Sequence, residues 1–409
     1  MPTRPDLSFI DLFAGCGGLS LGLEEAGFTP IFVNELSPEA MDTYLYNREN
    51  KHPILKERYH NHDIKELLEN KSELLRTAIK GMKRDYGLSA EKGQVDLVVG
   101  GPPCQGFSGI GHRRSYAVDK KRLPSNHLYQ DMIDVIRAVR PKMFLFENVR
   151  GLLSARWSNN ATSPRIWDQI RRDFSAIPGY DTASILIRAG DYAVPQNRPR
   201  VFIVGIKSSI GARQLQFDFG RGKHIENAID CGLFPEGKPG AAPHLEDLLG
   251  DLIDPAYMKG AIVTKHYPNP ADTAIQRELR FDPKSGRIRG KRRKVTQQEY
   301  SRHSDRVKLK FQALIDNDGV IPEKYKTRKF AQRLLPRRWS DHGPTITATS
   351  LPDDYVHFAQ PRILTVREWA RLQTFPDWSE FRGKRTTGGI RRAGNPREGI
   401  HSRGVPRYT

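Results

Sequence analysis

Cysteine is scarce and long hydrophobic runs are absent, and both features limit what this protein can be. The 409 residues contain three cysteines, Cys16, Cys104 and Cys231, too few for a disulfide framework or a four-thiolate metal site. No apolar run approaches the length of a membrane span, and the first residues lack the charged-then-apolar pattern of a signal peptide. We therefore expect no metal, no membrane partner and a reducing, cytoplasmic environment.

Acidic residues are also few relative to basic ones. Lys and Arg number 66 against 47 Asp and Glu, which leaves a formal net charge of +19. A surplus of this size predicts a polyanionic partner, and nucleic acid is the commonest. The hydrophobic content of 37% excludes a wholly disordered chain, and the length predicts two domains.

Short apolar runs alternate with segments of helical spacing in the first half of the sequence. In Leu128–Val139, for example, Leu128, Met132, Val135 and Ile136 fall on one helical face. This alternation predicts an α/β fold with a doubly wound, mostly parallel sheet. The runs that we expect to form strands are Leu7–Ala14, Pro30–Asn34, Val95–Val99, Met143–Glu147, Ala183–Arg188 and Val201–Ile206.

The periodicity weakens after Lys207, so we expect one domain over residues 1–207 and a smaller, irregular, basic domain over residues 208–409. Six of eight residues are basic in Arg287–Lys294, and seven are basic in Lys324–Arg338 with no acid. Regular spacing returns at Ile363–Phe375, where Thr365 would introduce a helix.

A glycine-rich turn, Asp11–Leu19, separates the first expected strand from the first helix. Gly15 and Gly17 permit a tight turn and close approach of a ligand to the backbone. Glu35 lies twenty residues after Gly15 at the end of the second strand, where a carboxylate can accept hydrogen bonds from ribose. An adenosine-containing cofactor is favoured over a turn that serves packing alone. Ser20 replaces the third glycine of the dinucleotide fingerprint, which disfavours a pyrophosphate cofactor.

Residues Gly100–Ser108 (GGPPCQGFS) directly follow the apolar run Val95–Val99 and include a cysteine, Cys104. Two prolines fix the backbone ahead of Cys104, and the glycines leave room for a flat substrate. A thiol at a strand end, near backbone N–H groups and many cations, is shifted toward the nucleophilic thiolate. A buried structural cysteine is the alternative, but a core thiol does not need these neighbours.

Two further polar clusters follow expected strands. Glu147 ends an apolar run, so its carboxyl group would be partly desolvated and able to hold a proton near neutrality; a helix cap is an equally good alternative. Arg198 and Arg200, in Gln196–Arg200, would point into the same cleft and suit a phosphate or carbonyl oxygen. Solvated surface arginines are the default alternative for that pair.

In this order, these segments resemble the cytosine-5 DNA methyltransferase family of bacterial restriction-modification systems. The matching segments span most of the chain and are Asp11–Phe28, Gly100–Ser108, Glu147–Val149, Gln196–Gly205 and Arg362–Asp377. The resemblance implies methyl transfer from S-adenosylmethionine to carbon 5 of a flipped-out cytosine in a specific duplex DNA sequence. It also implies a bacterial, monomeric enzyme, with a cognate restriction endonuclease as a candidate functional partner.

The resemblance implies roles for individual residues. Cys104 would attack carbon 6 of the cytosine, Glu147 would assist at ring nitrogen 3, and Arg198, supported by Arg200, would hold the base. The implied cofactor contacts are Phe13, Ala14, Gly15, Gly17, Glu35, Leu36, Asp63, Ile64, Pro102 and Leu128. The implied DNA contacts are Gln105, Ser108, Arg113, Arg114, Gln196, Arg292 and Arg293.

Three other functions compete with this interpretation. Methylation of tRNA is performed by a branch of the same family with a Cys-Phe-Thr signature, a tripeptide that this sequence lacks. A catalytically inactive DNA-binding homologue is the second alternative. In the family, a Gln-Ile-Gly-Asn-Ala-Val-Pro-Pro motif usually follows a segment like Val405–Thr409, and these 409 residues do not contain it. A nucleotide-dependent oxidoreductase would leave the +19 charge unexplained.

Overall fold

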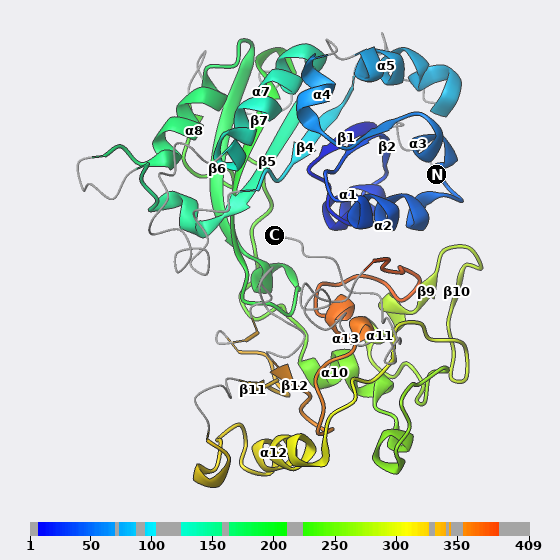
Figure 1. The fold of residues 1–409 in the computed structure, drawn as a ribbon. Helices are drawn as coiled ribbons and strands as arrows, with labels where there is room; N and C mark the ends of the chain where they lie inside the picture. Colours follow the sequence, from blue (N-terminus) through cyan, green and yellow to red (C-terminus); the bar gives the residue numbers. More distant parts are fainter. Residues whose placement is uncertain are drawn as a thin grey trace. The chain divides into compact units, whose positions relative to one another are not determined.

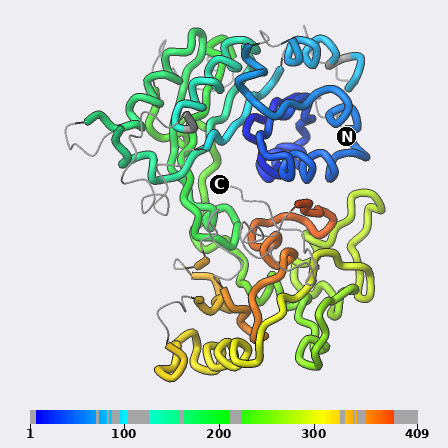
Figure 2. Tube along the Cα trace, in the orientation of Figure 1, coloured from blue at the N-terminus to red at the C-terminus, as the bar shows by residue number. Residues whose placement is uncertain are grey.

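The chain folds as two compact units. The computed structural model describes residues 7–69, 73–86, 95–103, 124–157, 163–210, 224–326, 332–340, 343–344 and 355–383. Unit 1 comprises Met1–Ile187 and Pro199–Gly237, and unit 2 comprises Arg188–Arg198 and Lys238–Tyr408. Figure 2 traces the chain through both units, with the sequence running from blue to red.

The sequence predicts one domain boundary after Lys207, whereas the two units interleave along the chain. The loop 188–198, between two strands of unit 1, belongs to unit 2 because its contacts lie there. Trp339 packs so closely on Gly190 that a Cβ atom would lie 2.6 Å from its ring, and the Asn197 N–H donates to the Pro344 carbonyl at 2.8 Å. Residues after Lys207 remain in unit 1, where Ala228 and Cys231 pack against the sheet.

Unit 1 is built on an eight-stranded sheet of order β3-β2-β1-β4-β5-β7-β6-β8 (Figure 1). Its strands are β1 Leu7–Leu12, β2 Phe28–Asn34, β3 His60–Asn61, β4 Leu97–Gly100, β5 Met143–Val149, β6 Tyr180–Arg188, β7 Pro199–Lys207 and β8 His224–Ile225. Neighbours from β3 through β5 run parallel, whereas β7 is antiparallel to β5. The six strands expected from the sequence are all present, and the mostly parallel sheet is confirmed.

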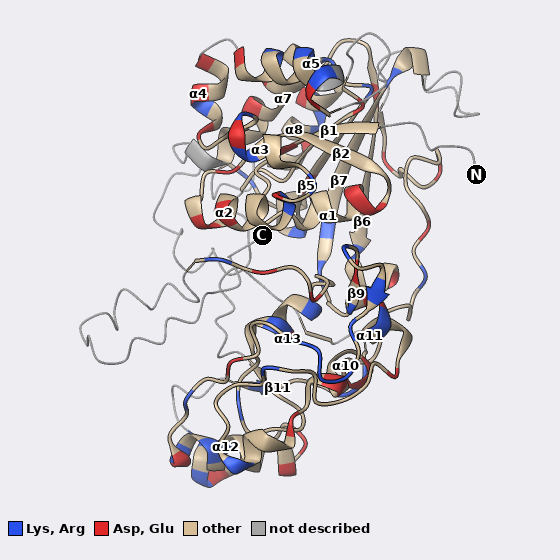
Figure 3. Ribbon diagram, turned by 90° about the vertical axis from the view of Figure 1, so that its right-hand side faces the viewer, with Lys and Arg blue, Asp and Glu red and all other residues tan. Residues whose placement is uncertain are grey.

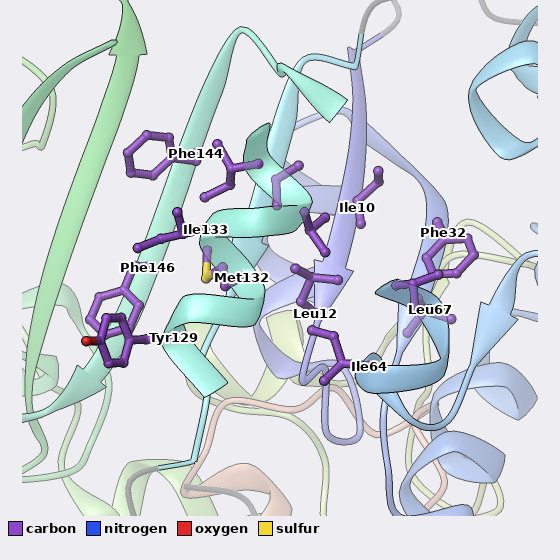
Figure 4. Packing of buried hydrophobic residues seen from close by; sticks show 14 of the residues in the cluster. Ile10, Leu12, Phe32, Ile64, Leu67, Tyr129, Met132, Ile133, Phe144 and Phe146 are labelled. Atoms are coloured by element: carbon purple, nitrogen blue, oxygen red, sulfur yellow. The ribbon is translucent and has the colours of Figure 1, made fainter. Parts of the chain in front are cut away.

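Helices cover both faces of this sheet, because successive strand side chains point to opposite sides. Phe9 packs with Leu19 and Leu23 of α1, whereas its neighbour Ile10 packs in the cluster that contains Met132 of α7 (Figure 4). The fold is therefore doubly wound. The α-helices of unit 1 are α1 Gly18–Glu25, α2 Pro38–Arg48, α3 Pro53–Glu57, α4 Ile64–Glu69, α5 Glu73–Tyr86, α7 Leu128–Val139 and α8 Ile166–Ser175.

Unit 2 consists of short elements joined by long irregular segments, as its weak periodicity predicts. Its helices and strands are α10 Leu245–Leu249, α11 Ala274–Leu279, β9 Phe281–Asp282, β10 Arg287–Ile288, α12 Asp305–Asp316, β11 Arg333–Leu334, β12 Tyr355–Val356 and α13 Val366–Arg371. Thr365 introduces α13 through a capping box with Glu368, which confirms the expected helix start. Among the described residues, no helix has both the length and the apolar composition needed to cross a bilayer.

Buried arginines hold unit 2 together. Arg371 is fully buried and pairs with Asp251 at 2.5 Å and with Asp377 at 2.6 Å. Arg362, also fully buried, pairs with Glu368 at 2.6 Å. Removing one partner from such a pair leaves a charge in a medium that solvates it poorly. The Arg371–Asp251 pair therefore fixes how α13 packs against a segment 120 residues earlier in the chain.

We expect Arg371→Met to lower the free energy of unfolding by about 3–5 kcal/mol, because it leaves two buried carboxylates without their shared partner. Urea denaturation of the whole chain, followed by tryptophan fluorescence, measures the change. Arg306→Met, on the exposed face of α12, is the matched control and should unfold like the wild type. Equal unfolding midpoints for the two variants would contradict the structural role of Arg371.

Acid should weaken the same core. Burial opposes the charged forms of Glu368 and Asp377, but Arg362 and Arg371 overcome this and hold the pKa of each carboxyl at about 2. A pKa below its unfolded value stabilises the fold above about pH 4, and that stabilisation disappears as the pH falls toward 2. We expect the free energy of unfolding to decline across this window. Urea titrations at several pH values give the slope of the unfolding free energy against pH. Glu368→Gln should reduce this slope by the equivalent of up to one proton. An unchanged slope would refute the lowered pKa of Glu368.

Candidate active site

Four neighbouring strands of unit 1 (β3, β2, β1 and β4) end in one row across the sheet, and β5 crosses the same row three residues before its end. In the hydrogen-bonded register, Asn61 lies beside Asn34, Asn34 beside Leu12, Leu12 beside Gly100 and Gly100 beside Phe146. Because these strands are parallel, the residues that follow each of them emerge at the same edge. That edge is where sequence analysis placed most of its candidate residues.

The glycine turn begins directly after β1. Phe13 and Gly15 have positive φ angles of 57° and 58°, and Gly17 has a φ of 85° where it begins α1. The Ala14 N–H donates to the Asn34 carbonyl at 3.0 Å, and the Gly17 N–H donates to the Ala14 carbonyl at 2.9 Å. The glycines at positions 15 and 17 are thus needed for backbone shape as well as for space.

Glu35, which follows β2, is tied to this turn. Its carboxylate accepts hydrogen bonds from the Gly15 N–H at 2.8 Å and from the Ser37 N–H at 2.7 Å. Burial raises the pKa of Glu35, and the two N–H donors oppose that rise. Next to it, Leu36 leaves 70% of its surface exposed. Glu35 therefore fixes the turn, and Leu36 offers an apolar surface beside it.

An ion pair that sequence analysis missed supports the turn from behind. Arg48, at the end of α2, is buried and pairs with Glu24 of α1 at 2.6 Å. The Arg48 guanidinium also donates to the Gly17 carbonyl at 3.1 Å, and a Cβ atom on Gly17 would lie 2.6 Å from Nη1 of Arg48. The arginine consequently occupies the space that a side chain at position 17 would need.

A second buried polar group lies beneath the same turn. The Ser20 hydroxyl donates to the Asp11 carboxylate at 2.5 Å and lies 2.8 Å from the Tyr44 hydroxyl. Burial raises the pKa of Asp11 to about 7, although Ser20 and Arg48 oppose the rise. These contacts join β1, α1 and α2, so the turn is held by its sequence neighbours and by residues more than 20 positions away.

The other expected cofactor residues lie near the same edge or in the core below it. Asp63 follows β3, and its carboxylate accepts from the Lys65 N–H at 2.9 Å at the start of α4. Ile64 and Pro102 are buried, and Leu128 is half-buried against the main core. The register thus brings Asp63, Glu35 and the glycine turn together, whereas Ile64 is placed as core support.

Glu147 lies within β5, two residues before its end at Val149, rather than at the end of a strand as expected. It lies against the segment that leads to Cys104. Its Oε1 accepts from Nε of Arg200 at 2.5 Å, and a Cβ atom on Gly101 would lie 2.8 Å from its Oε2. The neighbouring Asn148 donates to the Pro102 carbonyl at 3.1 Å. Both residues thus contact the Gly-Pro-Pro segment, and a side chain at position 101 would require the Glu147 carboxylate to shift.

Several predicted site residues lie outside the described part of the chain or away from this edge. Cys104, Gln105, Ser108, Arg113 and Arg114 are among the residues that the structure does not describe. Arg198 and Gln196 lie in the loop that belongs to unit 2, where Arg198 accepts from the Ala189 N–H through its carbonyl.

Gln196 differs from expectation. We expected it to contact DNA, but its side chain is 2% exposed and donates to the Leu372 carbonyl at 2.7 Å. This hydrogen bond anchors the loop 188–198 next to the end of α13. Arg292 and Arg293, by contrast, are exposed, as a role in contacting a polyanion requires.

Comparison with known proteins identifies the family. The family model described as "C-5 cytosine-specific DNA methylase" matches residues 7–396. The chain belongs to this family of DNA (cytosine-5-)-methyltransferases, as the site segments and the fold indicate. The resemblance stated from the sequence is therefore confirmed.

Named relatives are methyltransferases of type II restriction-modification systems. The type II methyltransferase M.DdeI of Desulfomicrobium norvegicum is 31% identical over 395 residues, covering 93% of this chain and 81% of the relative. M1.HphI of Haemophilus parahaemolyticus is 30% identical, and the match covers 93% of this chain and 80% of the relative. A putative DNA modification methyltransferase encoded in an Escherichia coli prophage has the same fold, with a TM-score of 0.59, 23% identity and coverage of 92% and 90%.

The ion pair behind the glycine turn makes a prediction about stability. We expect Arg48→Met to cost about 3–5 kcal/mol in the free energy of unfolding, because Glu24 would remain buried without its partner. Adding Glu24→Gln removes that charge and should recover part of the loss. Arg137→Met breaks an exposed pair with Asp134 and should cost less than about 1 kcal/mol in the same urea titration. Equal losses for Arg48→Met and Arg137→Met would contradict the supporting role.

Proposed function

We propose that this enzyme transfers a methyl group from S-adenosylmethionine to carbon 5 of a cytosine in a specific duplex DNA sequence, through a covalent adduct of Cys104. The observation that carries the proposal is the contact between Glu147 and Gly101, three residues before Cys104. It brings a carboxylate next to the segment that bears the nucleophile, at the edge where the glycine turn also lies. Membership of the cytosine-5 family supports the same chemistry.

The residues at the end of β1 and β2 fit S-adenosylmethionine. Leu36 supplies an exposed apolar surface for the adenine, and Glu35 can accept from ribose hydroxyls through the remaining lone pairs of its carboxylate. The turn at Phe13, Ala14, Gly15 and Gly17 brings backbone close to the ligand without side chains in the way. When bound, S-adenosylmethionine supplies an electrophilic methyl group on a sulfonium.

The separation between the two halves of the site suits this assignment. The strands β1 and β5 are separated by β4 alone, so the glycine turn and Glu147 lie two strand spacings apart, about 10 Å. In the proposal, the cofactor lies beyond the end of β1 and the base lies beyond β4, next to Glu147. A base within a stacked duplex cannot enter such a site, so the cytosine must leave the helix.

Cys104 acts as the nucleophile in the proposed reaction. Its thiolate forms a bond to carbon 6 of the cytosine while Glu147 donates a hydrogen bond or proton to ring nitrogen 3. The electron pair moves to carbon 5, which takes the methyl group from the sulfonium and leaves a neutral thioether. Water or another base then takes the proton from carbon 5, and the electrons of that C–H bond form the ring double bond and expel the thiolate from carbon 6. Any proton given to ring nitrogen 3 returns to Glu147.

Arg200 positions Glu147 for this role. By holding Oε1, it fixes the carboxyl group while Oε2 lies toward Gly101. Arg198, two residues earlier, would hold the base and the covalent intermediate. Asp63 would meet the adenine amino group, and Pro102 and Leu128 would complete the cofactor pocket.

The proposed partner is duplex DNA, with phosphates bound by basic residues including Arg292 and Arg293. Gln105, Ser108, Arg113 and Arg114 would contact DNA after Cys104. The type II relatives support a place in a bacterial restriction-modification system, with a cognate endonuclease as functional partner. We further propose that the enzyme works as a monomer in the bacterial cytoplasm.

Trapping the covalent intermediate tests the mechanism. Duplex DNA in which every cytosine is replaced by 5-fluorocytosine contains the target whatever its sequence. Fluorine cannot leave as a proton does, so wild-type enzyme with S-adenosylmethionine should form an adduct that survives denaturation. We expect Cys104→Ala to form none, as measured by the gel mobility of labelled DNA. Equal amounts of adduct with both proteins would exclude Cys104 as the nucleophile.

Two controls define the substrate and the role of Glu147. Transfer of labelled methyl groups should occur to duplex DNA and not to tRNA; labelling of tRNA alone would overturn the choice of substrate. Glu147→Gln keeps the size of the side chain and should slow methyl transfer about 10²-fold or more, within the range typical of general acid–base groups.

A further inference from the structure

An exposed apolar pair lies on the β9–β10 hairpin of unit 2. Phe281 and Ile288 are directly opposite one another in the antiparallel register, and each leaves 46% of its surface exposed. Cross-strand neighbours of this kind present one continuous apolar surface. Large apolar side chains that remain together on the outside commonly mark a contact site.

Cations lie close to this pair along the chain. Lys284 and Arg287 lie on the hairpin itself, and the exposed Lys291, Arg292, Arg293 and Lys294 follow it. Figure 3 shows Lys and Arg in blue beside β9. The acid within the hairpin, Asp282, is already engaged by Arg289 at 3.0 Å. The surface therefore combines an apolar centre with excess positive charge.

The structure holds this surface in place from below. Arg280, directly before β9, is fully buried, pairs with Asp251 at 2.5 Å and lies 3.7 Å from the centre of the Tyr267 ring. It also donates to the Arg289 carbonyl at 3.3 Å, on the far strand of the hairpin. The base of the hairpin is thereby fixed to the buried core of unit 2.

The basic segment after the hairpin is fixed as well. The Arg292 N–H donates to the Tyr267 carbonyl at 3.1 Å, and the Tyr267 N–H donates to the Arg293 carbonyl at 3.0 Å. Val295 is buried and its N–H donates to the Lys265 carbonyl at 3.0 Å. A cationic segment with an ordered backbone loses less entropy on binding than a flexible one does.

Charge and shape together select the partner. The cations require a polyanion, and the apolar pair requires a polyanion that also exposes sugar or base surfaces. Duplex DNA offers both, because apolar side chains can contact deoxyribose and base edges in a groove or enter a base step. A polyanion of phosphate alone offers nothing to Phe281 and Ile288.

We infer that Phe281 and Ile288 form an apolar contact with duplex DNA, flanked by phosphate contacts from Arg287, Arg292 and Arg293. This inference rests on the proposed function, which names DNA as the substrate. It adds that Phe281 and Ile288 supply the part of the affinity for DNA that salt does not weaken. Phosphate contacts weaken as the salt concentration rises, whereas apolar contacts do not.

Salt titrations separate the two kinds of contact. Fluorescence anisotropy measures binding of the full chain to a labelled duplex that carries the sequence the enzyme methylates. Repeating the measurement at several salt concentrations gives the affinity and the slope of its logarithm against the logarithm of the salt concentration. We expect Phe281→Ala/Ile288→Ala to bind about tenfold or more weakly with an unchanged slope. Arg292→Ala/Arg293→Ala should instead reduce the slope by about two, one for each phosphate that an arginine no longer neutralises.

Controls distinguish the removal of an apolar surface from damage to the fold. Leu309→Ala removes an apolar side chain that is 60% exposed on α12 and should bind like the wild type. Phe281→Leu should retain most of the affinity. Inorganic polyphosphate should bind the Phe281→Ala/Ile288→Ala variant as well as it binds the wild type, since it offers no apolar surface.

Two results would overturn the inference: wild-type affinity for DNA in Phe281→Ala/Ile288→Ala, or an equal loss of affinity for polyphosphate in that variant. Failure of the proposed function looks different, because the wild type itself would then neither methylate nor bind duplex DNA.

Discussion

The register of five neighbouring strands is the constraint on which the candidate active site depends. Backbone hydrogen bonds keep β3, β2, β1, β4 and β5 in step, so that the last residues of the first four form one row with Phe146 of β5. A slip of one residue would move side chains to the opposite face of the sheet and separate the groups that follow. Glu35 therefore reaches the glycine turn, and Glu147 reaches Gly101, because the strand register places them there.

Buried arginines fix the positions of helices and loops that strand pairing alone does not determine. Arg48 holds two helices and the Gly17 carbonyl in unit 1, and Arg371 holds two carboxylates in unit 2. An arginine suits this task because its planar guanidinium donates in several directions and stays charged when buried. In both units it joins segments that are distant in sequence. Loops that carry chemistry or partner contacts can thus be ordered with few regular elements, as in unit 2.

The sequence was sufficient to predict the sheet and the glycine turn, because each depends on local patterns of apolar residues and glycine. It placed Glu147 in the right strand but at its end, whereas β5 continues to Val149. It was not sufficient for Arg48 or Arg371, since a buried arginine on a short helix resembles one that faces solvent. Glu24 and Asp251, which pair with them, lie 24 and 120 residues away and have no signal in a single sequence. Gln196 was also misplaced by its sequence context. A polar residue near two arginines is expected at the surface in contact with DNA, but Gln196 is buried and donates to the Leu372 carbonyl.

The pairing of Glu147 with Arg200 bears on how one carboxylate can both stay ordered and remain able to act. An unpaired carboxylate at the end of an apolar strand would rotate freely, whereas a fully enclosed one would not meet a substrate. Here one oxygen is held by Nε of Arg200 while the other lies against a residue without a side chain. The two oxygens of this carboxyl group thus have different neighbours. A larger residue at position 101 would change this arrangement, because its Cβ atom would lie 2.8 Å from Oε2 and the carboxyl group would have to shift.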